Sequence, residues 1–177
     1  LSLSLVGVVA VFCNFGILPI MKRKIAKSKE KLLLYLGNAI GIKIFISTPL
    51  IFIITFFLCL MFNFPWETII IACLVIFHSS LTSLTSYVGS AFISLHRNDL
   101  VLKINILAKS LSLFFSIYLL VNGYQLMIIL LSSILISFSI FLLSVNITKS
   151  LFSRFKIKFD RLFIKKYIFL SLPLVLA

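Results

Sequence analysis

Long runs of apolar residues alternate with short polar segments along the whole chain. A helix needs about 20 mostly apolar residues to cross a bilayer, and five runs come close to or exceed that length without containing a carboxylate. The pattern predicts five complete transmembrane spans, at residues 1–21, 44–62, 68–95, 104–121 and 126–148. A sixth apolar run begins at residue 167 and continues to residue 177, so we expect it to be the start of another span.

The continuity of these runs favours helices over a membrane barrel. Barrel strands have about 10 residues and alternate strictly between apolar and polar positions, whereas these runs are longer and continuous. The composition agrees with a lipid environment, because 62% of the residues are apolar and 12% are charged, against roughly 45–50% and about 25% in a soluble domain. We therefore expect an all-α fold, namely a polytopic transmembrane helix bundle.

The net charge of +13 is concentrated in three short segments. All Lys and Arg residues except Lys43 and Lys109 lie in these segments, which are residues 22–31, 96–103 and 149–166. The intervening segments 63–67 and 122–125 contain none. Cationic loops stay on the cytoplasmic side, so we expect the first residue to lie outside. The same distribution explains the charge without nucleic acid as a partner.

The basic segment 149–166 also contains apolar residues at helical spacing, including Phe152, Phe155 and Phe159. This spacing fits an amphipathic helix on the cytoplasmic leaflet, although residues 155–159 also alternate like a strand. Both alternatives remain open from the sequence. Because the chain begins and ends within apolar runs, we expect it to be an internal piece of a longer protein.

The sequence offers no catalytic or metal-binding constellation. Its four acids, Glu30, Glu67, Asp99 and Asp160, all lie in polar segments and form no pair for acid–base chemistry. The three cysteines lie within apolar runs, without CxxC or Cys/His spacing. We therefore expect no enzyme activity and no cofactor.

The best candidate for a functional side chain is Lys109, within the predicted span 104–121. Asn105, Ser112 and Ser116 share its face of a helix, because they recur at steps of three and four residues. A lysine in a span either extends its ammonium to the interface or lines a wet internal path. Both explanations stay open from the sequence.

Three further polar residues are weaker candidates for the substrate path. His78 lies inside the span 68–95, Asn14 lies inside 1–21, and Lys43 lies at the predicted start of 44–62. A single intramembrane His is more often a packing residue, and a terminal Lys more often reaches the interface. Rows of serine in the spans, such as Ser79, Ser83 and Ser86, are typical of helix–helix packing.

Three strings in the chain resemble the polysaccharide biosynthesis or oligosaccharide flippase family, within the superfamily that also contains multidrug extruders and lipid II flippases. The strings are NFGILPIMKRKIAKSKEKLLLYLGNAIGIKIFIS from residue 14, SSLTSLTSYVGSAFISLHRNDLVLKINI from residue 79, and FKIKFDRLFIKKYIFLSLPL from residue 155. The sequence departs from the family at His96, where members often have Glu. The resemblance covers nearly all of the chain.

The resemblance implies a two-lobed transporter in which residues 1–148 belong to the first lobe, 149–166 form a cytoplasmic linker, and 167–177 begin the second lobe. It implies a flippase in the bacterial plasma membrane that moves polyprenyl-diphosphate-linked oligosaccharide for O-antigen, capsule or exopolysaccharide synthesis. Lipid-linked oligosaccharide would be the partner. Ion coupling and contact with other polysaccharide-assembly membrane proteins remain open. The alternatives are a multidrug extruder of the same fold and a membrane glycosyltransferase or repeat-unit polymerase.

The charge pattern makes a direct prediction about topology. In a variant lacking Cys13, Cys59 and Cys73, a cysteine introduced at Asn63 should react with an impermeant thiol reagent added to intact cells. A cysteine at Lys27 should stay unlabelled, because cationic loops remain cytoplasmic. The reverse labelling would overturn the predicted orientation.

Overall fold

The computed structural model describes Gly7 and residues 32–151, and the regular structure within residues 32–151 is entirely helical. The helices are α3 (Leu32–Ile42), the π-helical turn η2 (Lys43–Ser47), α4 (Thr48–Met61), α5 (Trp66–Ser94), α6 (Asn98–Val121) and α7 (Leu126–Leu151). The elements α3, η2 and α4 follow one another without a break and form a single helix of 30 residues. The expectation of an all-α fold therefore holds for the described residues.

Four helices of the described region are long and apolar enough to cross a membrane, by length and composition. They are Leu32–Met61, Trp66–Ser94, Asn98–Val121 and Leu126–Leu151, and to within one residue they contain the predicted spans 44–62, 68–95, 104–121 and 126–148. These helices are consistent with a membrane protein. The predicted span 1–21, most of the segment 149–166 and the run 167–177 lie outside the described residues.

The helices are longer than the apolar runs at three places. The first begins at Leu32 and not at Ile44, and α7 continues through Lys149 to Leu151. The segment 96–103 was expected to be a loop, but α6 already begins at Asn98. Asp99 lies in the first turn of α6, where a carboxylate is favourable because the amino end of a helix carries partial positive charge. Charged residues therefore extend this helix beyond the apolar run.

Pro49 does not interrupt its helix, and a π turn lies immediately before it. Proline has no N–H to donate to the carbonyl four residues earlier. Both the backbone N–H of Thr48 and its hydroxyl donate to the carbonyl oxygen of Lys43, five residues back, the hydroxyl at 2.8 Å. The Thr48 hydroxyl also lies 3.3 Å from the Ser80 hydroxyl on α5. The wider turn is thus held by bonds within the helix and to its neighbour.

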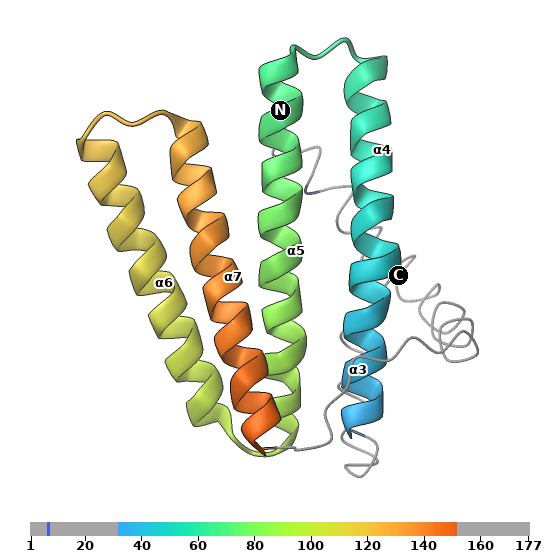
Figure 1. Cartoon of the computed structure of the whole chain (residues 1–177), viewed down its shortest axis with the longest axis vertical. Helices are drawn as coiled ribbons and strands as arrows, with labels where there is room; N and C mark the ends of the chain where they lie inside the picture. Colours follow the sequence, from blue (N-terminus) through green and yellow to red (C-terminus); the bar gives the residue numbers. More distant parts are fainter. Residues whose placement is uncertain (1–6, 8–31, 152–177) are drawn as a thin grey trace.

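The helices run alternately up and down (Figure 1). The central helix is α5, which contacts α3, α4, α6 and α7. It packs against α4 and α3 on one side and against α7 on the other, while α6 packs mainly on α7. The turns α4–α5 and α6–α7 lie at one end of the bundle, and the turn α5–α6 lies at the opposite end. The two short turns predicted to face outside are therefore at the same end.

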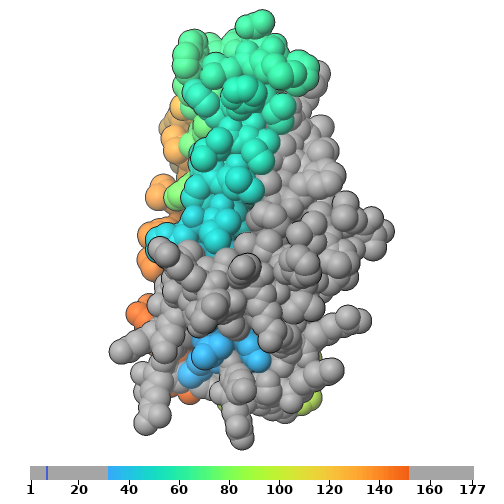
Figure 2. Space-filling model, turned by 90° about the vertical axis from the view of Figure 1, so that its right-hand side faces the viewer, coloured from blue at the N-terminus to red at the C-terminus, as the bar shows by residue number. Residues whose placement is uncertain are grey.

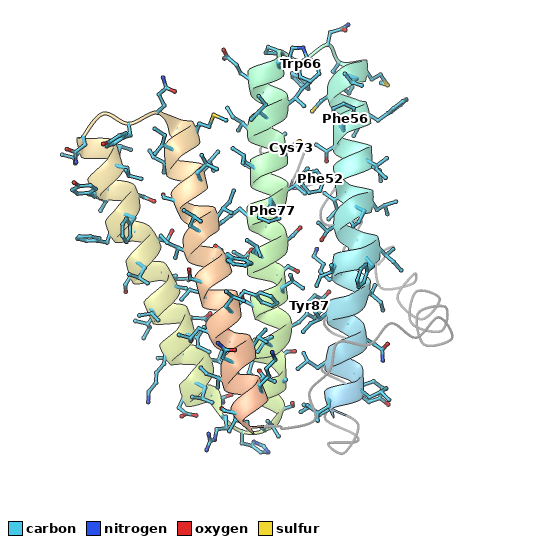
Figure 3. The ribbon with its side chains drawn as sticks, viewed as in Figure 1. Phe52, Phe56, Trp66, Cys73, Phe77 and Tyr87 are labelled. Carbon is cyan, nitrogen blue, oxygen red and sulfur yellow. The ribbon has the colours of Figure 1, made fainter. Side chains whose placement is uncertain are left out.

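Two clusters of buried side chains hold this arrangement together. The larger joins α3, α5, α6 and α7 and includes Leu36, Tyr87 and Phe92; Tyr87 points from α5 toward α3 (Figure 3). The smaller joins α4 and α5 around Ile51 and Ile76. In Figure 2 the α4–α5 turn region lies at the top of the face shown, and side chains of α4 lie below it. Many apolar side chains elsewhere are exposed, especially on α6, where Ile104 is the one buried residue, as expected of helices that face lipid.

The helices α4, α5 and α6 end in the same capping geometry. Asn63, His96 and Gly123 each follow the last helical turn with a positive φ, of 50°, 60° and 72°. In each case the next backbone N–H donates to a carbonyl five residues back; for example, Arg97 donates to Phe92 at 3.0 Å. This is the Schellman motif, which satisfies carbonyls that the helix itself leaves free. It fixes where each turn begins.

The capping geometry predicts opposite effects for two substitutions. Gly123→Ala should lower the free energy of unfolding by about 1 kcal/mol, because a Cβ is strained at positive φ, although no atom lies within 4 Å of it. His96→Gly should raise stability by a smaller amount, because glycine relieves the strain but adds entropy to the unfolded chain. Reversible unfolding in bicelles would measure both. Equal effects of the same sign would contradict the assigned capping role.

Candidate functional site

A cavity of about 660 Å³ lies among α5, α6 and α7. Its volume falls within the range of about 300–1,000 Å³ that is usual for small-molecule sites. Its polar lining residues are His78, Thr82, Thr85, Ser86, Asn105, Lys109, Ser112, Ser116 and Ser137. The apolar lining residues are Ala108, Leu113, Ile136 and Ile140. A cavity with this many polar residues, within helices that could cross a bilayer, is the strongest candidate for a functional site in the described region.

The structure brings together four of the six candidate residues from the sequence. Asn105, Lys109 and Ser112 line the cavity from α6, together with Ser116, so the polar stripe does lie on one face of that helix. His78 lines the cavity from α5. The stripe and the histidine come from different spans, and their meeting depends on how α5 and α6 are arranged around α7.

Lys109 lies near the middle of its helix. At a rise of 1.5 Å per residue, the 24 residues of α6 span about 36 Å, and Lys109 lies about 16 Å from Asn98. The hydrocarbon core of a bilayer is about 30 Å thick. The charged residues Asp99 and Lys103 place the first turns of α6 before the apolar run 104–121, and Lys109 lies about 9 Å along the axis from Lys103. The Lys109 side chain is exposed and lines the cavity, which favours a wet internal path over extension to the headgroups.

The ionisable residues lining the cavity are one lysine and one histidine. In the described region the acids are Glu67 and Asp99, each in the first turn of its helix. Asp99 lies ten residues before Lys109 on the same helix, or about 15 Å along the axis. No carboxylate of the described residues is therefore positioned to pair with Lys109, and the site is cationic.

On the α5 wall of the cavity, the threonine and serine hydroxyls already donate hydrogen bonds to backbone carbonyls of their own helix. Thr82 donates to the Ser79 carbonyl at 2.9 Å, Thr85 to Leu81 at 3.1 Å, and Ser86 to Thr82 at 3.0 Å. Such bonds to the preceding turn are common for Ser and Thr in helices. The remaining lone pairs of these oxygens can accept hydrogen bonds, so this wall suits a ligand with hydroxyl donors.

The α6 wall has the opposite character. Within residues 32–151, no hydrogen bond joins Asn105, Lys109, Ser112 or Ser116 to another side chain or carbonyl. Their amide, ammonium and hydroxyl groups are therefore available as donors. Donors of this kind, one of them charged, are suited to phosphate or carboxylate oxygens. The cavity can thus bind an anion along α6 and sugar-like hydroxyls along α5.

The other two sequence candidates do not line this cavity. Lys43 was expected at a helix end, but that expectation is wrong, because the helix begins at Leu32 and Lys43 lies in its interior. Its side chain is 2% exposed and lies in the π turn. Asn14 lies outside the described residues. Lys43 is misplaced because the predicted span begins after this lysine, although residues 32–42 contain no charged residue and continue the helix toward its amino end.

Residues of α5 and α7 that line the cavity were not predicted as site residues. Thr82, Thr85, Ser86 and Ser137 form rows at helical spacing that the sequence indicates as packing surfaces. Part of that interpretation holds, since Ser90 is buried. The signal that could have distinguished the two uses is that His78, already a candidate from the sequence, lies on the same helix face as Thr82 and Thr85.

A second, smaller cavity of about 230 Å³ adjoins the first. It lies toward the α5–α6 turn, and its lining residues are Thr85, Ser86, Gly89, Ser90, Ile93, Val101, Ile104, Asn105 and Ser144. Thr85, Ser86 and Asn105 line both cavities. The polar surface around Lys109 therefore continues toward one end of the bundle.

The chain matches no protein-family model, no curated protein and no solved structure. Its family and its function are therefore proposed from the sequence strings and from the chemistry of the cavity.

Proposed function

We propose that this chain is part of a flippase that moves polyprenyl-diphosphate-linked oligosaccharide across the bacterial plasma membrane. The observation that carries the proposal is the cationic cavity around Lys109, which has no carboxylate among its described lining residues. The family resemblance of the sequence supplies the substrate class. The resemblance rests on strings of residues, and the cavity rests on how α5, α6 and α7 pack.

The cavity chemistry suits a diphosphate that carries sugars. The Lys109 ammonium and the uncommitted donors of Asn105 and Ser112 can bind phosphate oxygens, and charge-assisted hydrogen bonds of this kind are the stronger ones. The hydroxyl oxygens of α5 can accept bonds from sugar hydroxyls. The cost of an intramembrane charge, about 2.5–3.5 kcal/mol at mid-helix on insertion scales, is offset when an anionic partner binds.

The cavity favours this function over a multidrug extruder of the same fold. An extruder of cationic drugs needs a neutral or acidic cavity, because like charges repel at short range. The described lining contains a lysine and a histidine and no acid. The cationic lining is therefore the feature that separates the two functions.

The short turns on the predicted outer side favour a flippase over a glycosyltransferase or polymerase. The described turns between α4 and α5 and between α6 and α7 hold only a few residues each. An enzyme acting on exported glycans is expected to carry polar, charged loops there. We accordingly propose transport without catalysis by this part of the chain and without a cofactor.

The proposed mechanism is alternating access between two lobes, with the substrate site between them. The described helices would belong to the first lobe, and the basic segment 149–166 would link it to the second. The basic segments would face the cytoplasm, as the charge pattern predicts. Lipid-linked oligosaccharide and the surrounding bilayer would be the partners of this assembly.

The proposal predicts a graded series of effects at Lys109. Lys109→Ala should keep expression and membrane insertion but reduce glycan export roughly ten- to a hundredfold, because a hydrogen bond to a charged group contributes about 1.5–3 kcal/mol. Lys109→Glu should reduce export further through repulsion of the diphosphate, whereas Lys109→Arg should keep partial function. Surface glycan measured in cells at matched protein levels would test the series.

A matched control is available on the same helix. Lys103 is exposed and lines neither cavity, so Lys103→Glu changes the net charge equally without altering the site. Export should survive this substitution. If export also survives Lys109→Glu at normal protein levels, the anion-binding role of Lys109 is wrong.

A further inference from the structure

The smaller cavity extends from the Lys109 site toward the turn between α5 and α6. Ile93 lies two residues before the first residue of the Leu95–Arg97 turn, and Val101 lies four residues after its last. Each is therefore within about one helical turn, or 5.4 Å, of that end of the helices. The cavity thus occupies the space between the Lys109 site and the end of the bundle that carries the α5–α6 turn.

The walls of this smaller cavity are suited to water. Asn105 contributes an amide, and Thr85, Ser86, Ser90 and Ser144 contribute hydroxyl oxygens. Ser90 and Ser144 are 2% and 1% exposed, and their hydroxyls donate to the carbonyls of Tyr87 and Ile140. Their lone pairs remain available as acceptors. A space of about 230 Å³ is far larger than the ~30 Å³ share of one water in the liquid, so with these polar groups it has the room and the partners to hold several waters.

Gly89 stands where a side chain would narrow this space. It lies between Ser86 and Ser90 on α5, and a Cβ built on it would meet the Cγ1 of Val101 on α6 at 3.7 Å, with no other atom within 4 Å. That distance is an ordinary van der Waals contact, so alanine fits. A larger side chain would extend into the cavity between α5 and α6.

We propose that the smaller cavity is a hydrated entrance to the Lys109 site from the membrane face that carries the Leu95–Arg97 turn, and that Gly89 keeps it open. Water and the anionic head of a ligand reach Lys109 through this cavity, one wall of which is formed by Gly89 and Val101. The charge pattern predicts that this face is cytoplasmic. The inference concerns access alone and is independent of which anion the site takes.

Thiol labelling in the full chain tests this entrance. In a variant lacking native cysteines, Ser112→Cys reports on the large cavity and Asn105→Cys on the junction of the two cavities. Arg97→Cys and Asn63→Cys mark the two membrane faces. An impermeant reagent applied to the face that labels Arg97→Cys should modify Ser112→Cys and Asn105→Cys. Ile106→Cys is the matched control, because Ile106 adjoins Asn105 in sequence but is exposed and lines neither cavity.

Substitutions at Gly89 then test the role of that residue. Gly89→Leu should slow the labelling of Ser112→Cys by about tenfold or more, since a thiol reacts as the thiolate and that form requires water. Gly89→Ala should leave the rate nearly unchanged. Val101→Ala added to Gly89→Leu should restore labelling, because it removes the methyl groups opposite the new side chain.

Gly89→Cys extends the test without relying on the folding of the leucine variant. Its small side chain fits as alanine does, and its thiol should react from the face marked by Arg97→Cys and not from the face marked by Asn63→Cys. Labelling of Ser112→Cys only from the Asn63 face, or from neither face, would overturn the proposal. So would an unreactive Gly89→Cys, or unchanged access in a folded Gly89→Leu variant. None of these measurements depends on glycan export.

Discussion

The electrostatic cost of a lysine ammonium near the middle of a spanning helix is the constraint on which the rest of this structure depends. Lys109 lies within the apolar part of α6, and a charge inside a bilayer is tolerated where it meets water or an opposite charge. The described helices place no carboxylate beside Lys109. They place a cavity there whose lining includes hydroxyl and amide groups, so the packing of α5, α6 and α7 gives this ammonium a space that water or an anion can share.

Small residues on α5 make that arrangement possible. Serine, threonine and glycine recur along its carboxyl-terminal half, so neighbouring helices can approach without filling the space between them. Their hydroxyls donate to the carbonyls of the preceding turn, which leaves acceptors but few donors on the wall opposite Lys109. The helix–helix contacts and the polarity of the cavity thus come from the same residues. Apolar side chains such as Phe114 and Ile117 remain exposed on α6, where lipid would cover them.

The sequence predicts the helices and the polar face of α6 because both depend on local spacing. Hydropathy located the four described spanning helices, and steps of three and four residues placed Asn105 and Lys109 on one face. Hydropathy failed at Lys43, because the predicted span begins after this single lysine although residues 32–42 contain no charge, and neighbouring elements decide whether such a residue is buried. The meeting of His78 with Lys109 also escaped prediction, since it depends on packing between helices and not on spacing within one. Asn14 and the span 1–21 lie outside the described residues.

The π turn before Pro49 has a consequence for how the two halves of the first described helix face their neighbours. A π turn accommodates one residue more than the α-helical ladder would hold over the same length. Each residue of an α-helix turns the backbone by about 100°, given 3.6 residues per turn. Removing one residue between Lys43 and Ser47 would therefore return this turn to the α-helical ladder and leave Leu36 and Ile40 on the surface that they share with α5. Removing one residue elsewhere in α3 or α4 would rotate one part of the helix against the other by roughly 100°. The π turn is thus the place where this helix can lose a residue and keep both halves facing their neighbours.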